Sequence, residues 1–433
     1  MAASEAITDC GEYVVGRARH VIEHCGPRRA GSRGEAEALA VVGAELEEVA
    51  DRVDREPFTV APDAFFAAPM VVGVLLGFAA AAFWLSPWWA AAFSAAALAV
   101  YLFEVLLYRE FLDPFFPRRQ SANVVARLHP RGAARRRLIL CGHIDAACEW
   151  RLLHRCPRAV RYLVGLGLLT LPAALAFDVA SGLLALADAG RFAELRMPLG
   201  LLRAGTLPAA VLAVLFIDLT RVVPGANDDL SGVFLAVAMA RKVHIEIGRL
   251  EETELVVLVT GSEEAGIRGA KDFVRRHAAE LRSEETLVVA LEILRDADFL
   301  CVYRRDRNGC VRHARRACRL LVAAAADRGV DLAESVVYLG ATDAAAFSEV
   351  GIPATCLCAM DPAPAHYYHN RRDDWDNMDP ACIEHAAEVL WEALLRFDRQ
   401  GLGPAPGGRD GCAAVTGPPY AAYGPLRRSP KEV

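Results

Sequence analysis

Two adjacent carboxylates, Glu263 and Glu264, close the segment ELVVLVTGSEE. An apolar, β-branched run that ends in a turn with acidic residues is typical of the carboxyl edge of a parallel sheet, where open α/β folds bind their ligands. Carboxylates in such a position can ligate a metal ion or transfer a proton. The chemistry of this pair therefore depends on which other side chains reach the same edge.

Other metal-competent side chains occupy comparable positions, each at the end of a strand-like run or in a loop. They are His143, Asp145, Asp228, Asp229, Glu292, His369 and Asp373. Zinc accepts imidazole and carboxylate ligands alike, and one shared carboxylate can hold two ions about 3.5–4 Å apart. These residue types predict a centre for two metal ions.

Each motif alone has a simpler interpretation. In a chain with 54 acidic and 11 histidine residues, a lone His-x-Asp or Glu-Glu is more often a solvated turn than a catalytic site. Here, however, every such element follows an apolar run or a Gly/Asn-rich turn, which is where loops carry chemistry. The combination favours a metal site over coincidence.

In their order and residue patterns, the motifs resemble those of the co-catalytic di-zinc aminopeptidases, metallopeptidase family twenty-eight. This family includes leucyl-type aminopeptidases and glutamate carboxypeptidase. The family pattern begins with GPR-x-x-GS-x-G, here GPRRAGSRG, and continues with H-x-D, G-A-N-D-D-x-S-G and E-E-x-G-x-x-G. A strand-end acidic residue, a D-x-x-x-F-x-x-x-G-I-P-A segment and Y-H-x-x-x-D complete it. The resemblance covers about residues 10–400, with two large interruptions.

The resemblance implies that five residues hold two zinc ions. Asp228 would bridge both ions. His143 and Glu292 would complete one site, whereas the other would be completed by Glu264 and His369. The usual family residue at the position of Glu292 is Asp; both are competent zinc ligands, but they differ in reach. A weaker second metal, or a single-zinc enzyme like the related glutaminyl cyclases, is the alternative at this position.

The resemblance also implies roles for residues that do not bind metal. Glu263 would be the general base that takes a proton from a metal-bridged water and delivers it to the leaving amine. Asp145 would accept the second imidazole N–H of His143 and so fix its tautomer. Tyr368 would donate a hydrogen bond to the tetrahedral oxyanion. Two further motif positions, Asp343 and Asp373, would orient their neighbours rather than ligate metal.

The amino-acid composition indicates that part of the chain lies in a membrane. The hydrophobic fraction of 54% and mean hydropathy of +0.24 are high for a soluble enzyme, so we expect part of the apolar mass to face lipid. The net charge of −6 gives no indication of nucleic-acid binding. The 12 cysteines lack a CxxC pair or regular spacing, which favours reduced thiols and a domain that faces the cytoplasm.

Two apolar regions interrupt the family pattern. Between Asp63 and Glu104 there is no charged residue, and the sequence SPWW in the middle predicts a tight turn between two membrane helices. The second region lies within residues 159–220. It is weaker as a membrane segment, because Asp178 and Arg203 lie inside it. The alternative for both regions is a hairpin buried in a soluble protein.

Arginines flank both regions on the side of the catalytic motifs, at Arg109, Arg118, Arg119, Arg151, Arg155, Arg158 and Arg161. Each hairpin returns to the same domain, so all catalytic segments must lie on one side of the bilayer. The positive-inside rule predicts that this side is the cytoplasm. The first fifty residues resemble polar and amphipathic helices rather than a secretory signal.

Elsewhere, strand-like runs alternate with helical patterns. This alternation predicts an α/β fold with a mostly parallel mixed sheet, helices on both faces and transmembrane hairpins inserted in loops. The resemblance implies that the sheet has the zinc-exopeptidase fold. We expect a peptidase domain in three pieces, two hairpins and a disordered tail. Their ranges are 1–63, 109–158 and 221–400 for the domain, 64–108 and 159–220 for the hairpins, and 401–433 for the tail.

The sequence thus predicts a multi-pass, membrane-anchored zinc exopeptidase that removes N-terminal residues from peptides. Its expected partners are a peptide substrate and the lipid bilayer, without nucleic acid. One alternative is a single-zinc cyclase of the same fold, similar to glutaminyl cyclase. Another is a non-catalytic membrane receptor or scaffold, which the retention of every metal-competent position and of Glu263 disfavours.

Overall fold

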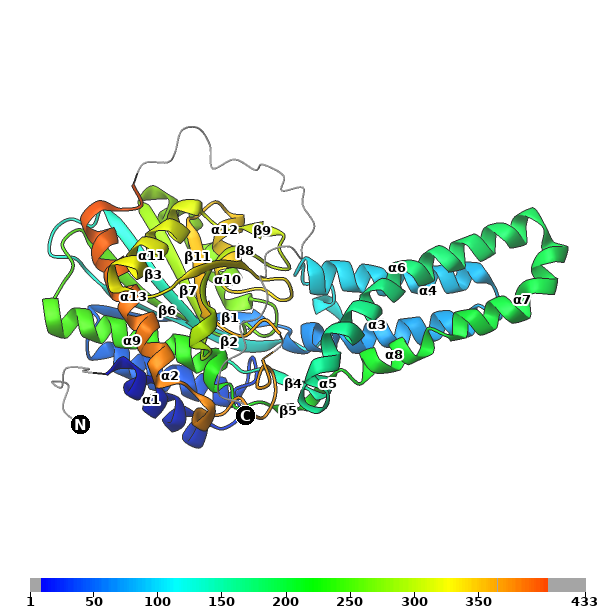
Figure 1. The fold of residues 1–433 in the computed structure, drawn as a ribbon, viewed down its shortest axis with the longest axis horizontal. Coiled ribbons are helices and arrows are strands. Elements are labelled where there is room, and N and C mark those ends of the chain that lie inside the picture. The colour runs from blue at the N-terminus through cyan, green and yellow to red at the C-terminus, as the bar shows by residue number, and fades with distance from the viewer. Residues whose placement is uncertain (1–8, 364, 404–433) are drawn as a thin grey trace. The chain divides into compact units, whose positions relative to one another are not determined.

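A computed structural model describes residues 9–363 and 365–403, so most of the tail predicted to be disordered lies outside the described residues. Its central element is a nine-stranded sheet (Figure 1). The strand order is β1 (Arg52–Val60), β2 (Arg119–Leu128), β6 (Thr253–Thr260), β3 (Arg136–His143), β7 (Glu285–Leu294), β11 (Ala354–Ala359), β8 (Leu300–Asp306) and β10 (Ala333–Val336), with β9 (Val311–Arg312) paired to β8.

Four neighbouring strands, β6, β3, β7 and β11, run parallel. The flanking strands β2 and β8 are antiparallel to this block, and β1 is antiparallel to β2. Every residue of β6 and nearly every residue of β7 is buried, as expected for parallel strands covered on both faces. The carboxyl ends of the four parallel strands therefore meet at one edge of the sheet.

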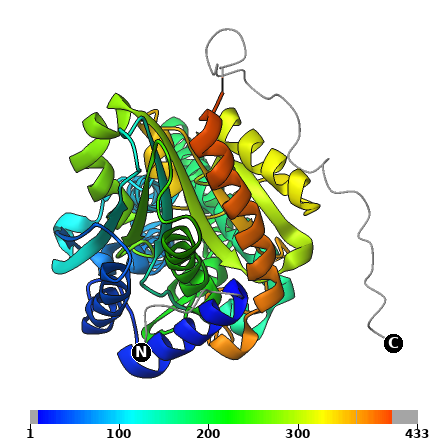
Figure 2. The ribbon, with the colours of Figure 1, turned by 90° about the vertical axis from the view of Figure 1, so that its left-hand side faces the viewer.

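Helices cover both faces. On one face lie α1 (Cys10–Cys25), α2 (Arg33–Glu47), α9 (Ser231–Lys242), α11 (Arg315–Arg328) and α13 (Pro380–Gln400); on the other lie α10 (Arg268–Ser283) and α12 (Ala344–Glu349). Figure 2 shows α13, in orange-red, crossing the sheet. Successive residues of β3 alternate between the two cores, because Leu138 and Leu140 join one cluster and Ile139 and Cys141 the other. The predicted fold class is confirmed.

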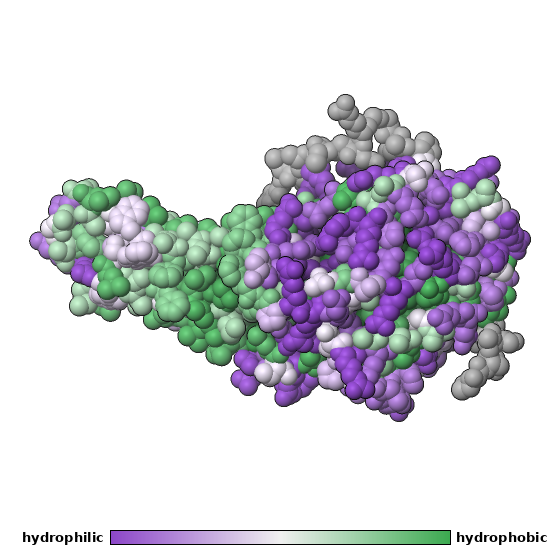
Figure 3. Space-filling view, turned by 180° about the vertical axis from the view of Figure 1, so that it is seen from behind, coloured by the Kyte–Doolittle hydropathy of each residue, from purple (hydrophilic) through white to green (hydrophobic). Residues whose placement is uncertain are grey.

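The inserted regions form long apolar helices, which pack beside one another in Figure 1. The first region contains α3 (Pro62–Ala82) and α4 (Pro87–Val100), which continues into a π-helix at Tyr101–Leu106; the second contains α6 (Pro157–Ala187), α7 (Ala189–Ala204) and α8 (Leu207–Val214). Four helical segments, Pro62–Ala82, Pro87–Leu106, Pro157–Ala187 and Ala189–Val214, are long and apolar enough to cross a membrane. Figure 3 shows a mostly hydrophobic surface over these helices and a mostly hydrophilic one over the sheet domain.

The charges that weaken the second region in the sequence are paired inside the helix bundle. The guanidinium Nε of Arg203 lies 2.7 Å from Oδ1 of Asp178, and both side chains are buried. Ser94, from the first hairpin, donates to Asp178 over 2.7 Å and accepts from Arg203 over 3.0 Å. Ionisable residues in membrane segments typically face the bundle interior and pair there. This network therefore neutralises the pair and joins the two hairpins.

Both hairpins are attached next to the edge of the sheet where the parallel strands have their carboxyl ends. Arg268, at the start of α10, donates to both carboxylate oxygens of Asp113 over 2.8 and 2.9 Å and lies 3.4 Å from Glu104, in the π-helix that ends the first hairpin. The second hairpin begins and ends at a two-stranded sheet of β4 (Cys148–Trp150) and β5 (Ile217–Val222). The helices are thus tied to the loops that follow β3 and β6.

Candidate active site

Asp228 lies between two histidines. Its Oδ1 is 3.1 Å from Nε2 of His143, and its Oδ2 is 3.1 Å from Nε2 of His369. His143 is the last residue of β3, whereas Asp228 precedes α9 and His369 lies in the loop after β11. A carboxylate that offers one oxygen to each of two imidazoles has the geometry of a ligand shared by two metal ions.

Each of the two other predicted ligands lies beside one of these two imidazoles. Oε1 of Glu264, in the turn after β6, lies 3.4 Å from Nε2 of His369. Oε2 of Glu292, near the end of β7, lies 3.9 Å from Nε2 of His143. All five side chains are buried. The structure therefore brings together every ligand that the sequence motifs indicate.

Two groups of three residues have ligand atoms close enough together to hold one metal ion. One group is His143, Asp228 and Glu264, and the other is His143, Asp229 and Glu292; within each group the ligand atoms lie within 4.8 Å of one another. Asp229 is already engaged, because its oxygens accept the main-chain N–H groups of His143 and Gly232, each over 3.1 Å. These bonds fix Asp229 as a support for the end of β3. Asp228 is the better candidate for the shared ligand because both of its oxygens face imidazoles.

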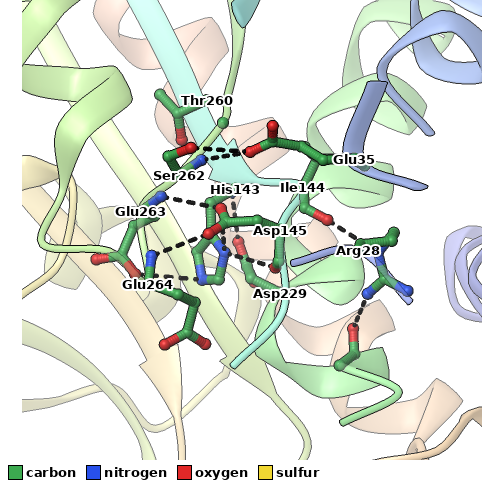
Figure 4. Close-up of polar contacts among 12 residues, drawn as sticks. Arg28, Glu35, His143, Ile144, Asp145, Asp229, Thr260, Ser262, Glu263 and Glu264 are labelled. Atoms are coloured by element: carbon green, nitrogen blue, oxygen red, sulfur yellow. Dashed lines mark hydrogen bonds and ion pairs between the residues drawn. The ribbon is translucent and has the colours of Figure 1, made fainter. Parts of the chain in front are cut away.

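Glu263 shares the turn with Glu264, and its Oε2 is 3.9 Å from Nε2 of His143. The carboxylate of Asp145 holds this turn by accepting the main-chain N–H of Glu263 over 2.9 Å and that of Glu264 over 3.1 Å (Figure 4). The Nδ1 atom of His143 is 3.1 Å from the main-chain carbonyl oxygen of Asp145 and 3.6 Å from its carboxylate. The closer partner of the imidazole is thus the carbonyl, and the carboxylate mainly orients the acidic turn.

Tyr368 stacks on the ring of His369, with ring centroids 3.9 Å apart. Trp150 makes a T-shaped contact with the same imidazole, with ring centroids 4.7 Å apart. Tyr368 also lines the cavity that opens over the acidic residues. Burial raises the pKa of Tyr368 well above its usual value, which keeps the phenol protonated and able to donate.

Asp373 and Asp343 hold the loops around the site. Asp373 accepts hydrogen bonds from the main-chain N–H and the side-chain amide of Asn227, over 2.9 and 2.8 Å, and from the main-chain N–H of Asp228 over 3.2 Å. Asp343 accepts the hydroxyl of Thr260, at the end of β6, over 2.5 Å. These contacts join the loop of Asp373 to that of Asp228, and Asp343 to the end of β6.

Two supporting residues escape prediction from the sequence, and the first is Glu35. Its carboxylate accepts the main-chain N–H of Ser262 over 2.8 Å and the hydroxyl of the same residue over 3.1 Å (Figure 4). Ser262 has a left-handed backbone, with φ of 57°, so these bonds stabilise a strained turn directly before Glu263. Burial raises the pKa of Glu35 to about 8.

The second is Arg28, which is also fully buried. It donates to the carbonyls of Ile144 and Gly225, each over 2.9 Å, and so joins the loop after β3 to the loop that carries Asp228. The only signal in the sequence for either residue is the GPRRAGSRG motif, which contains Arg28 and directly precedes Glu35.

The electrostatics of the site fit a bound cation. Burial raises the pKa of Glu263, Glu264 and Glu292 well above the usual range, and neighbouring carboxylates raise it further. Oε1 of Glu264 and Nδ1 of His369 are buried and have no hydrogen-bond partner. Burying several carboxylates without a countercharge is costly, and imidazole with carboxylate is a donor set that suits zinc. The residues therefore fit zinc.

Comparison with known proteins agrees with this geometry. Residues 206–394 match the sequence profile of Peptidase family M28. No curated protein sequence matches the chain significantly. Among solved structures, a zinc aminopeptidase from Bacillus subtilis superposes with a TM-score of 0.55 at 13% identity, covering 89% of this chain and 95% of that one.

Two other solved structures have the same fold. An aminopeptidase from Aneurinibacillus sp. strain AM-1 has a TM-score of 0.52 at 15% identity, covering 90% of this chain and 96% of that one. A glutaminyl cyclase from an Acidobacteriales bacterium also has a TM-score of 0.52, at 13% identity, covering 92% and 98%. The resemblance to the M28 peptidases is confirmed. The profile match and the shared fold support a metallopeptidase-like enzyme and imply zinc as its metal.

Proposed function

We propose that this protein is a membrane-anchored, zinc-dependent aminopeptidase. The observation that carries the proposal is the position of Asp228, whose two carboxylate oxygens each lie 3.1 Å from a different imidazole. The profile match includes the four proposed ligands that follow β5, namely Asp228, Glu264, Glu292 and His369, and also Glu263. Support for the peptidase class also comes from the zinc aminopeptidases of the same fold.

In this proposal the metal ligands are His143, Asp228, Glu264, Glu292 and His369. When bound, zinc polarises the scissile carbonyl and lowers the pKa of a water molecule. Glu263 takes the proton of the attacking water and returns it to the leaving amine. Tyr368 donates a hydrogen bond to the oxyanion. Asp145 and Glu35 keep the turn of Glu263 in place through the main-chain bonds described above.

Membrane attachment is part of the same proposal. Four helical segments have the length and composition of membrane spans, and they carry exposed apolar side chains such as Phe78, Leu169, Leu186 and Val211. Buried polar groups between them are paired, as in membrane bundles. The arginines beside both hairpins support a catalytic domain in the cytoplasm.

One experiment separates this function from its rival on the same fold. The purified full-length protein is analysed for zinc content and is given a free dipeptide, its N-acetylated form and a peptide with N-terminal glutamine. An aminopeptidase binds two zinc ions and hydrolyses the free dipeptide but spares the blocked one. Cyclisation of the glutamine peptide, with one zinc ion and no hydrolysis, would identify a cyclase instead. Absence of zinc and of turnover would reject both.

A further inference from the structure

A cavity runs from the acidic residues into the helix bundle. Its volume is about 420 Å³, within the ~300–1,000 Å³ of pockets that hold small molecules. At one end it is lined by polar side chains of the candidate site, namely Asp228, Glu263, Glu264, Glu292, Tyr368 and His369. The other end lies between α3, α6 and α8. A ligand that touches the acidic residues can therefore extend among the apolar helices.

The helical part of the cavity is lined mainly by aliphatic and aromatic side chains. Leu76 of α3 and Leu171 of α6, both almost fully buried, form part of this wall together with Leu212 of α8. The hydroxyls of Thr170 and Thr206 donate to carbonyls of their own helical turns, over 2.8 and 2.9 Å. These hydroxyls are therefore not free to donate to a ligand.

This lining discriminates between ligand chemistries. A peptide extended along the helices would bury amide groups against walls that offer them few partners, and each unpaired amide is unfavourable. An alkyl chain has no hydrogen-bonding groups to leave unpaired there, and each buried methylene increases the affinity roughly fourfold. The cavity thus suits a long alkyl chain better than a peptide chain.

One residue of the cavity wall is also among the exposed apolar side chains of the bundle. Leu166 lines it and is 60% exposed on α6, within a segment long and apolar enough to cross a membrane. A chain anchored in a bilayer could therefore enter between the helices while its polar head remains at the acidic residues. The exposed wall residue, the apolar lining and the connection to the acidic residues all fit an amphiphile.

We propose that the substrate is a membrane-borne amphiphile: an aminoacyl amide with a free amino group and a long alkyl chain, whose chain lies between α3, α6 and α8. This inference rests on the proposed aminopeptidase function. In the reaction, water adds to the amide carbon, the C–N bond breaks, and the proton from water passes to the leaving nitrogen. The products are an amino acid and a long-chain amine when the chain lies on the amine side.

The test uses the full-length protein in lipid nanodiscs, loaded with zinc, and a series of leucyl alkylamides with chains of two to sixteen carbons. Below the aggregation concentration of each substrate, we expect kcat/KM to rise roughly fourfold per added methylene and to level off when the cavity is full. A second series, 2-aminoalkanoyl amides, places the chain on the other side of the scissile bond. The series that shows the rise identifies which side faces the helices.

Matched glycine variants on α6 locate the effect. Gly167 lines the cavity, and a Cβ added there would meet no atom within 4 Å, so Gly167→Phe adds a ring that competes with the alkyl chain. Gly165 has equally open surroundings but does not line the cavity, so Gly165→Phe is the control. We expect Gly167→Phe to lower the ratio of long-chain to short-chain kcat/KM at least tenfold and Gly165→Phe to leave it unchanged. Ala209→Phe, on α8, is a second blocking variant if Gly167→Phe does not fold.

Outcomes for the two proposals are distinct. Hydrolysis of the short amides without any dependence on chain length in either series would overturn the amphiphile proposal and leave the aminopeptidase intact. Equal long-to-short ratios in Gly167→Phe and wild type, with both proteins folded, would overturn it as well. Absence of hydrolysis of every substrate, short ones included, would reject the aminopeptidase function itself.

Discussion

The carboxylate of Asp145 accepts the main-chain N–H of Glu263 over 2.9 Å. Asp145 therefore acts on the proposed general base through the backbone, by fixing the turn in which the base lies. Its second oxygen makes the same contact with the next residue of the turn. The turn of Glu263 and Glu264 is thus held by a carboxylate that follows a different strand of the sheet.

This contact predicts the behaviour of Asp145→Asn. An asparagine presents only one acceptor oxygen to the two main-chain N–H groups, so the turn loses one bond. We expect kcat to fall about 10- to 100-fold, with KM changed much less. Steady-state kinetics and zinc analysis check this. Wild-type kcat in a folded Asp145→Asn protein would show that the turn does not need both bonds.

The proposed base is tested by Glu263→Gln. Because only proton transfer is removed, we expect zinc content to be retained and kcat to fall about 10²- to 10⁴-fold. His369→Ala and Glu264→Ala provide the contrast, since loss of a ligand should reduce zinc content as well as activity. Near wild-type turnover in Glu263→Gln would assign the base elsewhere, and full zinc content in both alanine variants would contradict the ligand roles.

Glu292 stands where the resembling family usually has Asp. Glu292→Asp should remain active, because the shorter carboxylate is also a zinc ligand. Glu292→Ala should lose one zinc ion and most activity. Elemental analysis and turnover measured on the same samples decide the matter. If neither substitution alters zinc content or rate, Glu292 is not a ligand.

The membrane assignment predicts fractionation. Spans of about twenty residues can cross a hydrocarbon core of about 30 Å, so the full-length chain should sediment with membranes, resist high salt and alkali, and require detergent. Protease added outside intact cells should not reach the catalytic domain. Recovery in the soluble fraction would mean that the apolar helices are covered by protein, and cleavage from outside would reverse the orientation.

The buried pair inside the bundle predicts non-additive stability. Arg203→Met leaves Asp178 buried without its partner and should destabilise the fold by roughly 3–5 kcal/mol. Replacing both residues, with Asp178→Leu and Arg203→Met, should recover much of this loss because no unpaired charge remains. Thermal unfolding in one detergent compares the three variants: each single substitution and the double. If the loss of stability in the double variant equals the sum of the losses in the two single variants, the two side chains act independently.

Much of the fold and of the candidate site could be predicted from the sequence. The apolar runs of β3, β6 and β7 end directly at or near acidic and histidine residues, so the parallel block and its ligands are readable together. Contacts that join distant segments through the main chain were not predictable. The bonds from Ser262 to Glu35 and from Glu263 to Asp145 depend on the backbone conformation of a loop, which side-chain identity does not encode.

The same limit applies to the helix bundle. In the sequence, Asp178 and Arg203 only weaken a hydrophobic segment, because the pairing depends on how helices pack. The apolar cavity was also unpredictable, since its walls come from three helices in two separate insertions. Hydrophobicity indicates that helices are apolar, but it does not indicate whether they pack tightly or leave space between them.

The register of the first two strands shows how the first hairpin is joined to the sheet. Val60, the last residue of β1, pairs directly with Arg119, the first residue of β2, although the whole first hairpin lies between them. Strands paired in this way can be joined by a turn of two residues. The pairing of β1 with β2 therefore does not need the hairpin, and a two-residue turn from Val60 to Arg119 would leave the strand order of the sheet unchanged.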